Sequence, residues 1–213
     1  MKHVVSILVV CCAMLAAGGT KGEEEDRHTG SEVEELIQRL LQEGKDMIDI
    51  IRLREKQDQR NGLIAWCEVI PEPERGHIVQ VGVWIGEATQ IFAQHFRTVT
   101  DVDSWKGLED VYKQYRHYCG NIFNVYHIRR PSIEAAKQFQ HESISAVYID
   151  ASRDQQSVED DINAWYPIVA PGGYIGGHDY CGAWPGVEAA IKKTLPQYTP
   201  VIFEDTSWLI KKA

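Results

Sequence analysis

The chain of 213 residues is 44% hydrophobic and 25% charged, values typical of a globular protein with a well-buried core. Its formal net charge of −9 argues against nucleic-acid binding, because proteins that bind a phosphate backbone usually carry a basic stripe. The composition leaves the oligomeric state open.

Residues 1–18 are predicted to be a signal peptide. Lys2 and His3 precede about fourteen apolar residues, and small residues follow, which is the usual order of such a segment. The run is shorter than the about twenty apolar residues of a membrane span, so we expect no integral span after its removal. A start codon chosen too far upstream, or a buried N-terminal segment, would also explain it.

A linker and a helical extension are expected next. Residues 19–30 are polar, charged and glycine-bearing, as in a linker. Ser31 and Glu34 form a capping-box signal, and apolar residues then recur at helical spacing. We therefore expect an N-terminal helical extension over 31–76, with one or two helices between 31 and 57 and a turn at Asn61-Gly62.

From residue 77 onward, strands and helices alternate. The expected strands are 78–83, 98–102, 125–128, 144–149 and 174–177, and the expected helices include 87–95, 133–139 and 187–193. Another helix should follow the fourth strand, run through Trp165 and Val169, and stop at Pro171-Gly172-Gly173. The tail "PVIFEDTSWLIKK" predicts two strands around a turn at Asp205-Thr206. This order predicts an α/β domain over 77–213, with a doubly wound, mainly parallel sheet and a C-terminal antiparallel hairpin.

Three other features have simpler interpretations. Cys67, Cys119 and Cys181 are too widely spaced for a disulfide framework or a CxxC metal site, so we expect packing residues. Trp165 and Trp208 are expected in the core. Residues 107–124 are either a substrate-facing loop or a helix with a polar face.

Glycines and acids lie at the ends of the expected strands. The first strand ends in "QVGVWIG", in which Gly82 and Gly86 form a G-x-x-x-G turn. Asp103 follows the second strand, about 20 residues after Gly82, which is where a carboxylate can reach a ribose. Asp150 follows the fourth strand and Asp179 the fifth. Glycines can simply permit tight packing and acids can cap helices, but their conjunction at one sheet edge favours a ligand site.

These segments resemble the class I S-adenosylmethionine-dependent methyltransferases, which have a Rossmann-like fold. The branch is that of the catechol and macrocin O-methyltransferases. The resemblance covers about residues 77–211 and rests on "VQVGVWIGEAT", "VDSWKG", "GVEAAI" and the block from Val147 to Tyr180. It implies an enzyme that methylates a small hydroxylated acceptor.

The resemblance also implies the site residues. Cofactor contacts would come from Gln80, Gly82, Trp84, Gly86, Asp103, Ser132 and Asp150. A divalent cation would be held by Asp150, His178 and Asp179, and carboxylate oxygens suit Mg²⁺. The cation would lower the pKa of the acceptor hydroxyl. The catalytic candidates are these three residues and Arg153. If no cation is bound, Asp150 would instead cap the next helix, and Asp179 would bind nearby backbone amides.

Two residues depart from the pattern of the family. Gln80 stands where the first strand ordinarily carries an acid, so it offers the cofactor's amino group no charge. Arg153 stands where many relatives have histidine, and it cannot be a general base because it stays protonated. Asp154, His178 or a metal-bound hydroxide would then take the proton. Arg153 either clamps an anionic acceptor or is a surface residue.

Two other functions stay open. A nicotinamide-dependent oxidoreductase is disfavoured because the chain lacks G-x-G-x-x-G after the first strand. A non-catalytic binding module that keeps the cofactor fold is favoured by Gln80, by Arg153 and by the export signal. Because S-adenosylmethionine is made in the cytosol, the location stays open between the secretory route and the cytoplasm.

Overall fold

The computed structural model describes residues 60–213. The predicted signal peptide, the linker and the helices expected between 31 and 57 lie outside the described residues. Within residues 60–213, every helix is too short or too polar to span a membrane.

A seven-stranded sheet runs through the described part of the chain, in the order β3-β2-β1-β4-β5-β7-β6. Five neighbouring strands are parallel: β3 (Val125–Arg129), β2 (Thr98–Asp103), β1 (His77–Val81), β4 (Ile144–Ile149) and β5 (Val169–Gly177). β7 (Trp208–Lys211) is antiparallel to β5, and β6 (Val201–Ile202) is antiparallel to β7. The predicted mainly parallel sheet with a closing hairpin is therefore confirmed.

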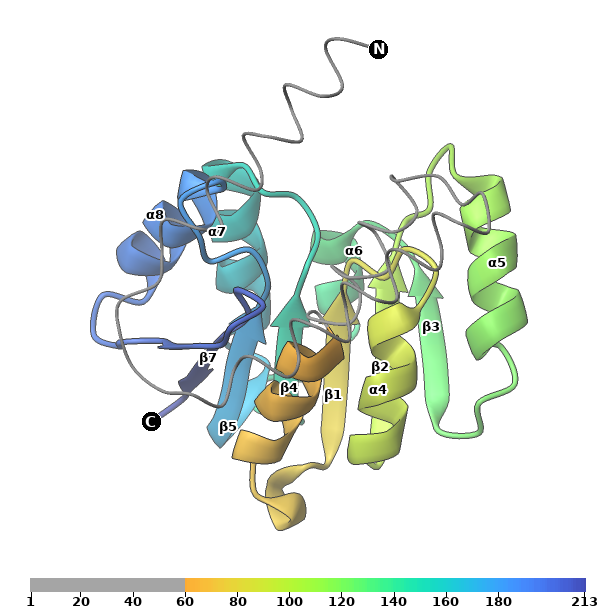
Figure 1. Cartoon of the computed structure of the whole chain (residues 1–213), viewed down its shortest axis with the longest axis horizontal. Helices are drawn as coiled ribbons and strands as arrows, with labels where there is room; N and C mark the ends of the chain where they lie inside the picture. Colours follow the sequence, from red (N-terminus) through yellow and green to blue (C-terminus); the bar gives the residue numbers. More distant parts are fainter. Residues whose placement is uncertain (1–59) are drawn as a thin grey trace, which may run out of the picture. The chain divides into compact units, whose positions relative to one another are not determined.

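Helices cover both faces of this sheet (Figure 1). One face carries the helical residues 60–69 and α4 (Glu87–His95), and η1 (Glu72–Glu74) links the former to β1. The other face carries α6 (Ser132–Ala136), α7 (Gln155–Trp165) and α8 (Pro185–Thr194). α5 (Glu109–Cys119) packs against Val83 and Trp105, which follow β1 and β2. Residues 107–124 thus form mainly a helix.

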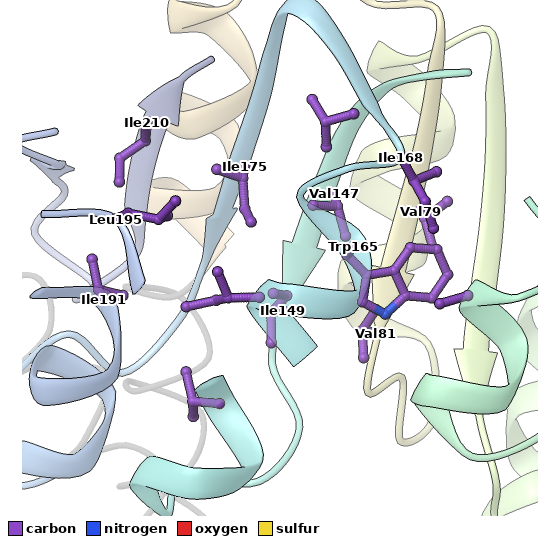
Figure 2. Packing of buried hydrophobic residues seen from close by; sticks show 14 of the residues in the cluster. Val79, Val81, Val147, Ile149, Trp165, Ile168, Ile175, Ile191, Leu195 and Ile210 are labelled. Atoms are coloured by element: carbon purple, nitrogen blue, oxygen red, sulfur yellow. The ribbon is translucent and has the colours of Figure 1, made fainter. Parts of the chain in front are cut away.

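Alternate strand residues enter two hydrophobic clusters, because successive side chains of a strand point to opposite faces. Figure 2 shows part of the cluster that includes α6, α7 and α8, and its members include Trp165, Val79, Val81, Val147, Ile149 and Ile175. The cluster on the opposite face contains Ile78, Ala146, Tyr148, Trp66 and Phe92. Trp165 and Trp208 are buried, as predicted.

The prediction of a turn at Asn61-Gly62 is wrong, because both residues are helical. Leu63, Trp66 and Ile70 follow at helical spacing and are buried against the sheet, so packing overrides the local turn signal. The Trp66 indole also donates a hydrogen bond to the carbonyl of Trp208, at 2.9 Å.

The expected end of α7 is also wrong. The helix ends at Trp165, and Val169 begins β5, which runs through the Pro171-Gly172-Gly173 segment expected to stop the helix. Val169 pairs with Ile144 while Tyr174 pairs with Ala146, so a register irregularity accommodates the extra residues. The apolar side chain of Val169 would suit the end of a helix or the start of a strand, and its pairing with Ile144 makes it part of β5.

Candidate active site

Two glycines with positive φ shape the turn after β1. Gly82 has φ 81° and Gly86 has φ 88°, a conformation that few other residues adopt. A Cβ on Gly82 would lie 2.1 Å from the carbonyl oxygen of Asp150, and one on Gly86 would lie 2.4 Å from the sulfur of Cys119. Close packing therefore requires both glycines, and Gly82 lies directly beside the residue that follows β4. The strand ends at Val81, two residues earlier than expected.

The carboxylate of Asp103 fixes this turn. Its Oδ2 accepts hydrogen bonds from the backbone amides of Val83, at 3.0 Å, and Trp84, at 3.2 Å. Its Oδ1 accepts one from the amide of Trp105, at 2.8 Å, and the Trp105 indole donates to the carbonyl of Trp84, also at 2.8 Å. Trp84 stays 56% exposed on the turn. A carboxylate has about four lone-pair positions, so Asp103 keeps capacity for a ligand hydroxyl.

Gln80 is buried and bonded within the protein. Its amide donates to the carbonyl of Gly82 at 3.1 Å, and its oxygen lies 3.1 Å from the hydroxyl of Thr89. Ser132, at the first turn of α6, accepts a hydrogen bond from the Trp165 indole at 2.8 Å. Both residues contribute to the framework of this sheet edge, and their predicted cofactor contacts stay predictions.

Asp101 is an acidic residue at this edge that the sequence analysis missed. It pairs with Gln80 across β1 and β2, and it is 0% exposed. Its Oδ2 accepts hydrogen bonds from Thr89 and Tyr115, both at 2.9 Å, while its Oδ1 has no partner. Burial raises its pKa to about 7. The available signal was an acid within the strand expected at 98–102, in "TVTDVD".

Asp150, His178 and Asp179 form a cluster at the ends of the paired strands β4 and β5. Each offers one ligand atom, and these atoms lie within 4.8 Å of one another. His178 is 8% exposed, and within the described part of the chain neither ring nitrogen makes a hydrogen bond. Its Nδ1 lies 3.2 Å from Asp179 and its Nε2 3.9 Å from Asp205, close enough for electrostatic attraction. We refer to the three residues as the acidic cluster.

Arg153 joins the acidic cluster rather than facing solvent alone. Its Nε donates to Oδ2 of Asp179, and its NH2 group lies 3.9 Å from Oδ1 of Asp150. Its guanidinium carbon lies 5.0 Å from the ring centroid of Trp184. The Arg153 side chain is 41% exposed on the loop before α7 while it contacts the cluster, so both interpretations of this residue stay open.

Burial and neighbouring charges together shift the pKa values of the cluster in different directions. Burial raises the pKa of Asp150, against the opposing effect of His178 and Arg153. Burial would also raise the pKa of Asp179, but its interactions with His178 and Arg153 lower it. Burial would lower the pKa of His178, but the surrounding carboxylates raise it. Asp150 is thus the carboxylate of this cluster best suited to take up a proton.

Asp154, another base considered from the sequence, caps α7. Its carboxylate accepts hydrogen bonds from the hydroxyl of Ser152, at 2.7 Å, and from the backbone amide of Ser157, at 3.0 Å. These bonds lower its pKa to about 2. Asp154 is therefore a weak base, and its position is explained by the helix.

The acidic cluster and Arg153 line one pocket. Its polar lining includes Asp150, Arg153, His178 and Asp179, and its apolar lining includes Val158, Val187 and Trp208. The pocket therefore places charged and apolar side chains side by side at this edge of the sheet.

Comparison with known proteins gives a family and a fold. Residues 79–180 match a family of methyltransferase domains. No curated protein matches the sequence.

Three solved structures illustrate the fold. A proposed caffeoyl-CoA O-methyltransferase of Staphylococcus aureus is 17% identical, with a TM-score of 0.57, and the alignment covers 85% of this chain and 99% of that one. The O-methyltransferase NovP is 18% identical, with a TM-score of 0.53 and coverages of 77% and 80%. CalS11, a TDP-rhamnose 3'-O-methyltransferase of calicheamicin biosynthesis, is 13% identical, with a TM-score of 0.52 and coverages of 90% and 96%. At these identities, the likeness establishes a shared fold alone.

Proposed function

Residues 79–180 match a family of methyltransferase domains, and from this premise we propose a specific reaction. The chain transfers the methyl group of S-adenosylmethionine to an oxygen of a small hydroxylated acceptor. The observation that carries the proposal is the contact between Gly82 and Asp150. It brings the glycine turn, where the cofactor would bind, next to the acidic cluster, where the acceptor would bind.

The residues of the turn would bind and orient the cofactor. Gly82 and Gly86 have no side chain to block the approach of a ligand to the backbone. Asp103 fixes the amides of the turn and would accept a hydrogen bond from a ribose hydroxyl. When bound, S-adenosylmethionine supplies an activated methyl group on a positively charged sulfur. The protein would accelerate the reaction mainly by holding this methyl group in line with the acceptor oxygen.

The acidic cluster and Arg153 would orient the acceptor and accept its hydroxyl proton. As the acceptor oxygen forms its bond to the methyl carbon and the carbon–sulfur bond breaks, the hydroxyl proton must leave. Asp150 is the proposed proton acceptor, because burial raises its pKa and it lies beside the glycine turn. Asp179 and Arg153, joined to each other, would orient the acceptor.

The donor atoms of the cluster suit the predicted divalent ion, but the positive charge of Arg153 already lies beside both carboxylates. Asp150, His178 and Asp179 are suitable ligands, and His178 has two ring nitrogens without a hydrogen bond. Arg153, however, already binds Asp179 and faces Asp150. Mg²⁺ therefore stays a prediction, and no step proposed above uses it.

Calorimetric titration with S-adenosylhomocysteine tests the cofactor. We expect one binding site in the wild type and no binding of NADH. Binding of NADH without S-adenosylhomocysteine would overturn the proposal and favour an oxidoreductase. A screen of hydroxylated acceptors with radiolabelled S-adenosylmethionine tests the transfer. Cofactor binding with no methylated product across the screen would favour the non-catalytic binding module.

A further inference from the structure

We propose that Arg153 is the resident cation of the acidic cluster. In this chain, its guanidinium takes the place of a divalent ion, and loss of its charge would turn the cluster into a divalent-metal site. The importance of the inference rests on the proposed function, because the cluster lies at the proposed catalytic edge. Metal titration nevertheless tests it without any methyl transfer.

The position of Arg153 is defined by three contacts. Its backbone packs against the start of α8, where a Cβ on Gly186 would lie 2.6 Å from the Arg153 carbonyl. Its Nε is bonded to Asp179, and its guanidinium lies over the ring of Trp184, at 5.0 Å. An arginine bonded on one side and stacked on the other is pre-organised, so it loses little freedom in holding the carboxylates.

The two carboxylates need a positive charge between them. Asp150 and Asp179 follow neighbouring parallel strands, and two such anions repel each other unless a cation or proton intervenes. Arg153 supplies that charge to Asp179 directly and to Asp150 at 3.9 Å. A divalent ion would need the same carboxylate oxygens. Because Arg153 belongs to the same chain, it competes with a dissolved ion at a high effective concentration.

The groups that remain without the arginine would suit a metal. The ligand atoms of Asp150, His178 and Asp179 lie within 4.8 Å of one another. His178 is buried, and both of its ring nitrogens lack a hydrogen-bond partner. Two carboxylates and an imidazole match the ligand preferences of Mn²⁺, and water molecules would complete its shell. Neutralisation by Arg153 is therefore the feature that separates this cluster from a metal site.

The experiment compares Mn²⁺ binding by the wild type, Arg153→Gln and Arg153→Lys. Free Mn²⁺ is counted by electron paramagnetic resonance, and the melting temperature is followed with and without the ion. We expect Arg153→Gln to bind one Mn²⁺ at least tenfold more tightly than the wild type, with a higher melting temperature in the ion. Arg153→Lys keeps the charge and should resemble the wild type. Arg130→Gln is the matched control, because Arg130 pairs with Glu134 on an exposed surface, at 4.0 Å.

A second substitution locates the new site. Adding Asp179→Asn to Arg153→Gln should abolish the gain in Mn²⁺ affinity. The proposal is overturned if the wild type binds Mn²⁺ as tightly as Arg153→Gln, or if a folded Arg153→Gln protein binds none. Should Arg153→Gln fail to fold, one tightly bound Mn²⁺ in the wild type would overturn the proposal, and its absence there and in Arg153→Lys would support it. Failure to bind S-adenosylhomocysteine would count against the proposed function alone.

Discussion

The carboxylate of Asp103 combines a structural role with a proposed binding role at this sheet edge. It accepts the backbone amides of Val83, Trp84 and Trp105, which hold the turn after β1 in place. The same carboxylate ends β2, at the position from which an acid reaches a ribose in related folds. Loss of Asp103 would therefore loosen the turn and also remove the proposed ligand contact.

Replacing Asp103 by alanine should weaken binding of S-adenosylhomocysteine by about 1.5–3 kcal/mol, the scale of a lost charged hydrogen bond. Calorimetric titration measures this as a dissociation constant raised roughly 10- to 150-fold. Asp110→Ala is the matched control, because Asp110 pairs with Lys113 on the exposed face of α5. Equal affinities of wild type and Asp103→Ala would remove Asp103 from the cofactor site.

Gly86 is a less informative residue to mutate. Its added Cβ would lie 2.4 Å from the Cys119 sulfur and 3.0 Å from the Tyr115 ring, in a backbone conformation with φ 88°. A Gly86→Val protein would thus lose stability whether or not a ligand binds there. The same residue pattern that predicts a cofactor turn is also a packing requirement.

At the scale of helices and strands, continuous apolar runs were the most reliable guide. Ile78–Val81 and Ile144–Ile149 are buried on both faces, as parallel strands require, and these strands were predicted within a few residues. Val169 was placed in a helix because its spacing continues the apolar face of α7. Only its pairing with Ile144, a residue far away in sequence, makes it a strand.

The candidate site was predictable for the same topological reason, but only in part. Parallel strands bring Asp150 and Asp179 to one edge, so their proximity follows from the strand order. The direction of a long side chain does not follow from it. Arg153 reaches Asp179 from the loop before α7 and stacks near Trp184 from the loop before α8, and neither contact has a signal in the sequence.

The packing of the helical residues 60–69 against the C-terminal hairpin gives a prediction at this scale. A Cβ on Gly62 would lie 1.9 Å from Cγ of Asp205, whose carboxylate is buried and accepts the amide and hydroxyl of Ser207. Gly62→Ala should therefore destabilise the protein by about 1–3 kcal/mol, even though alanine favours a helix.

Chemical denaturation measures that loss of stability, and Gly182→Ala is the control. A Cβ on Gly182 meets nothing within 4 Å, so its replacement should leave the free energy of unfolding within about 0.5 kcal/mol. A Gly62→Ala protein as stable as the wild type would show that the helix does not dock closely on Asp205.

For the molecule as a whole, the sheet edge that holds the candidate site carries a cost in stability. Asp101 is fully buried and pairs with Gln80 across β1 and β2, and one of its carboxylate oxygens has no partner among residues 60–213. An unsatisfied buried polar atom is expensive, and strain of this kind concentrates at functional sites. The cost depends on pH, because the neutral acid is easier to bury than its anion.

The last prediction follows from the pKa of about 7 that burial gives Asp101. In the unfolded chain this pKa is about 3.9, so the folded state holds its proton more tightly. The contribution to stability is complete below about pH 4 and is lost as the pH rises through about 7. The loss has an upper bound of ~4 kcal/mol, at about 1.36 kcal/mol per pKa unit.

In Asp101→Asn, a neutral amide imitates the protonated acid and should abolish this part of the pH dependence. Urea denaturation of both proteins between pH 4 and pH 8 measures it, with Asp110→Asn expected to follow the wild type. Parallel curves for wild type and Asp101→Asn would show that Asp101 does not titrate in this range.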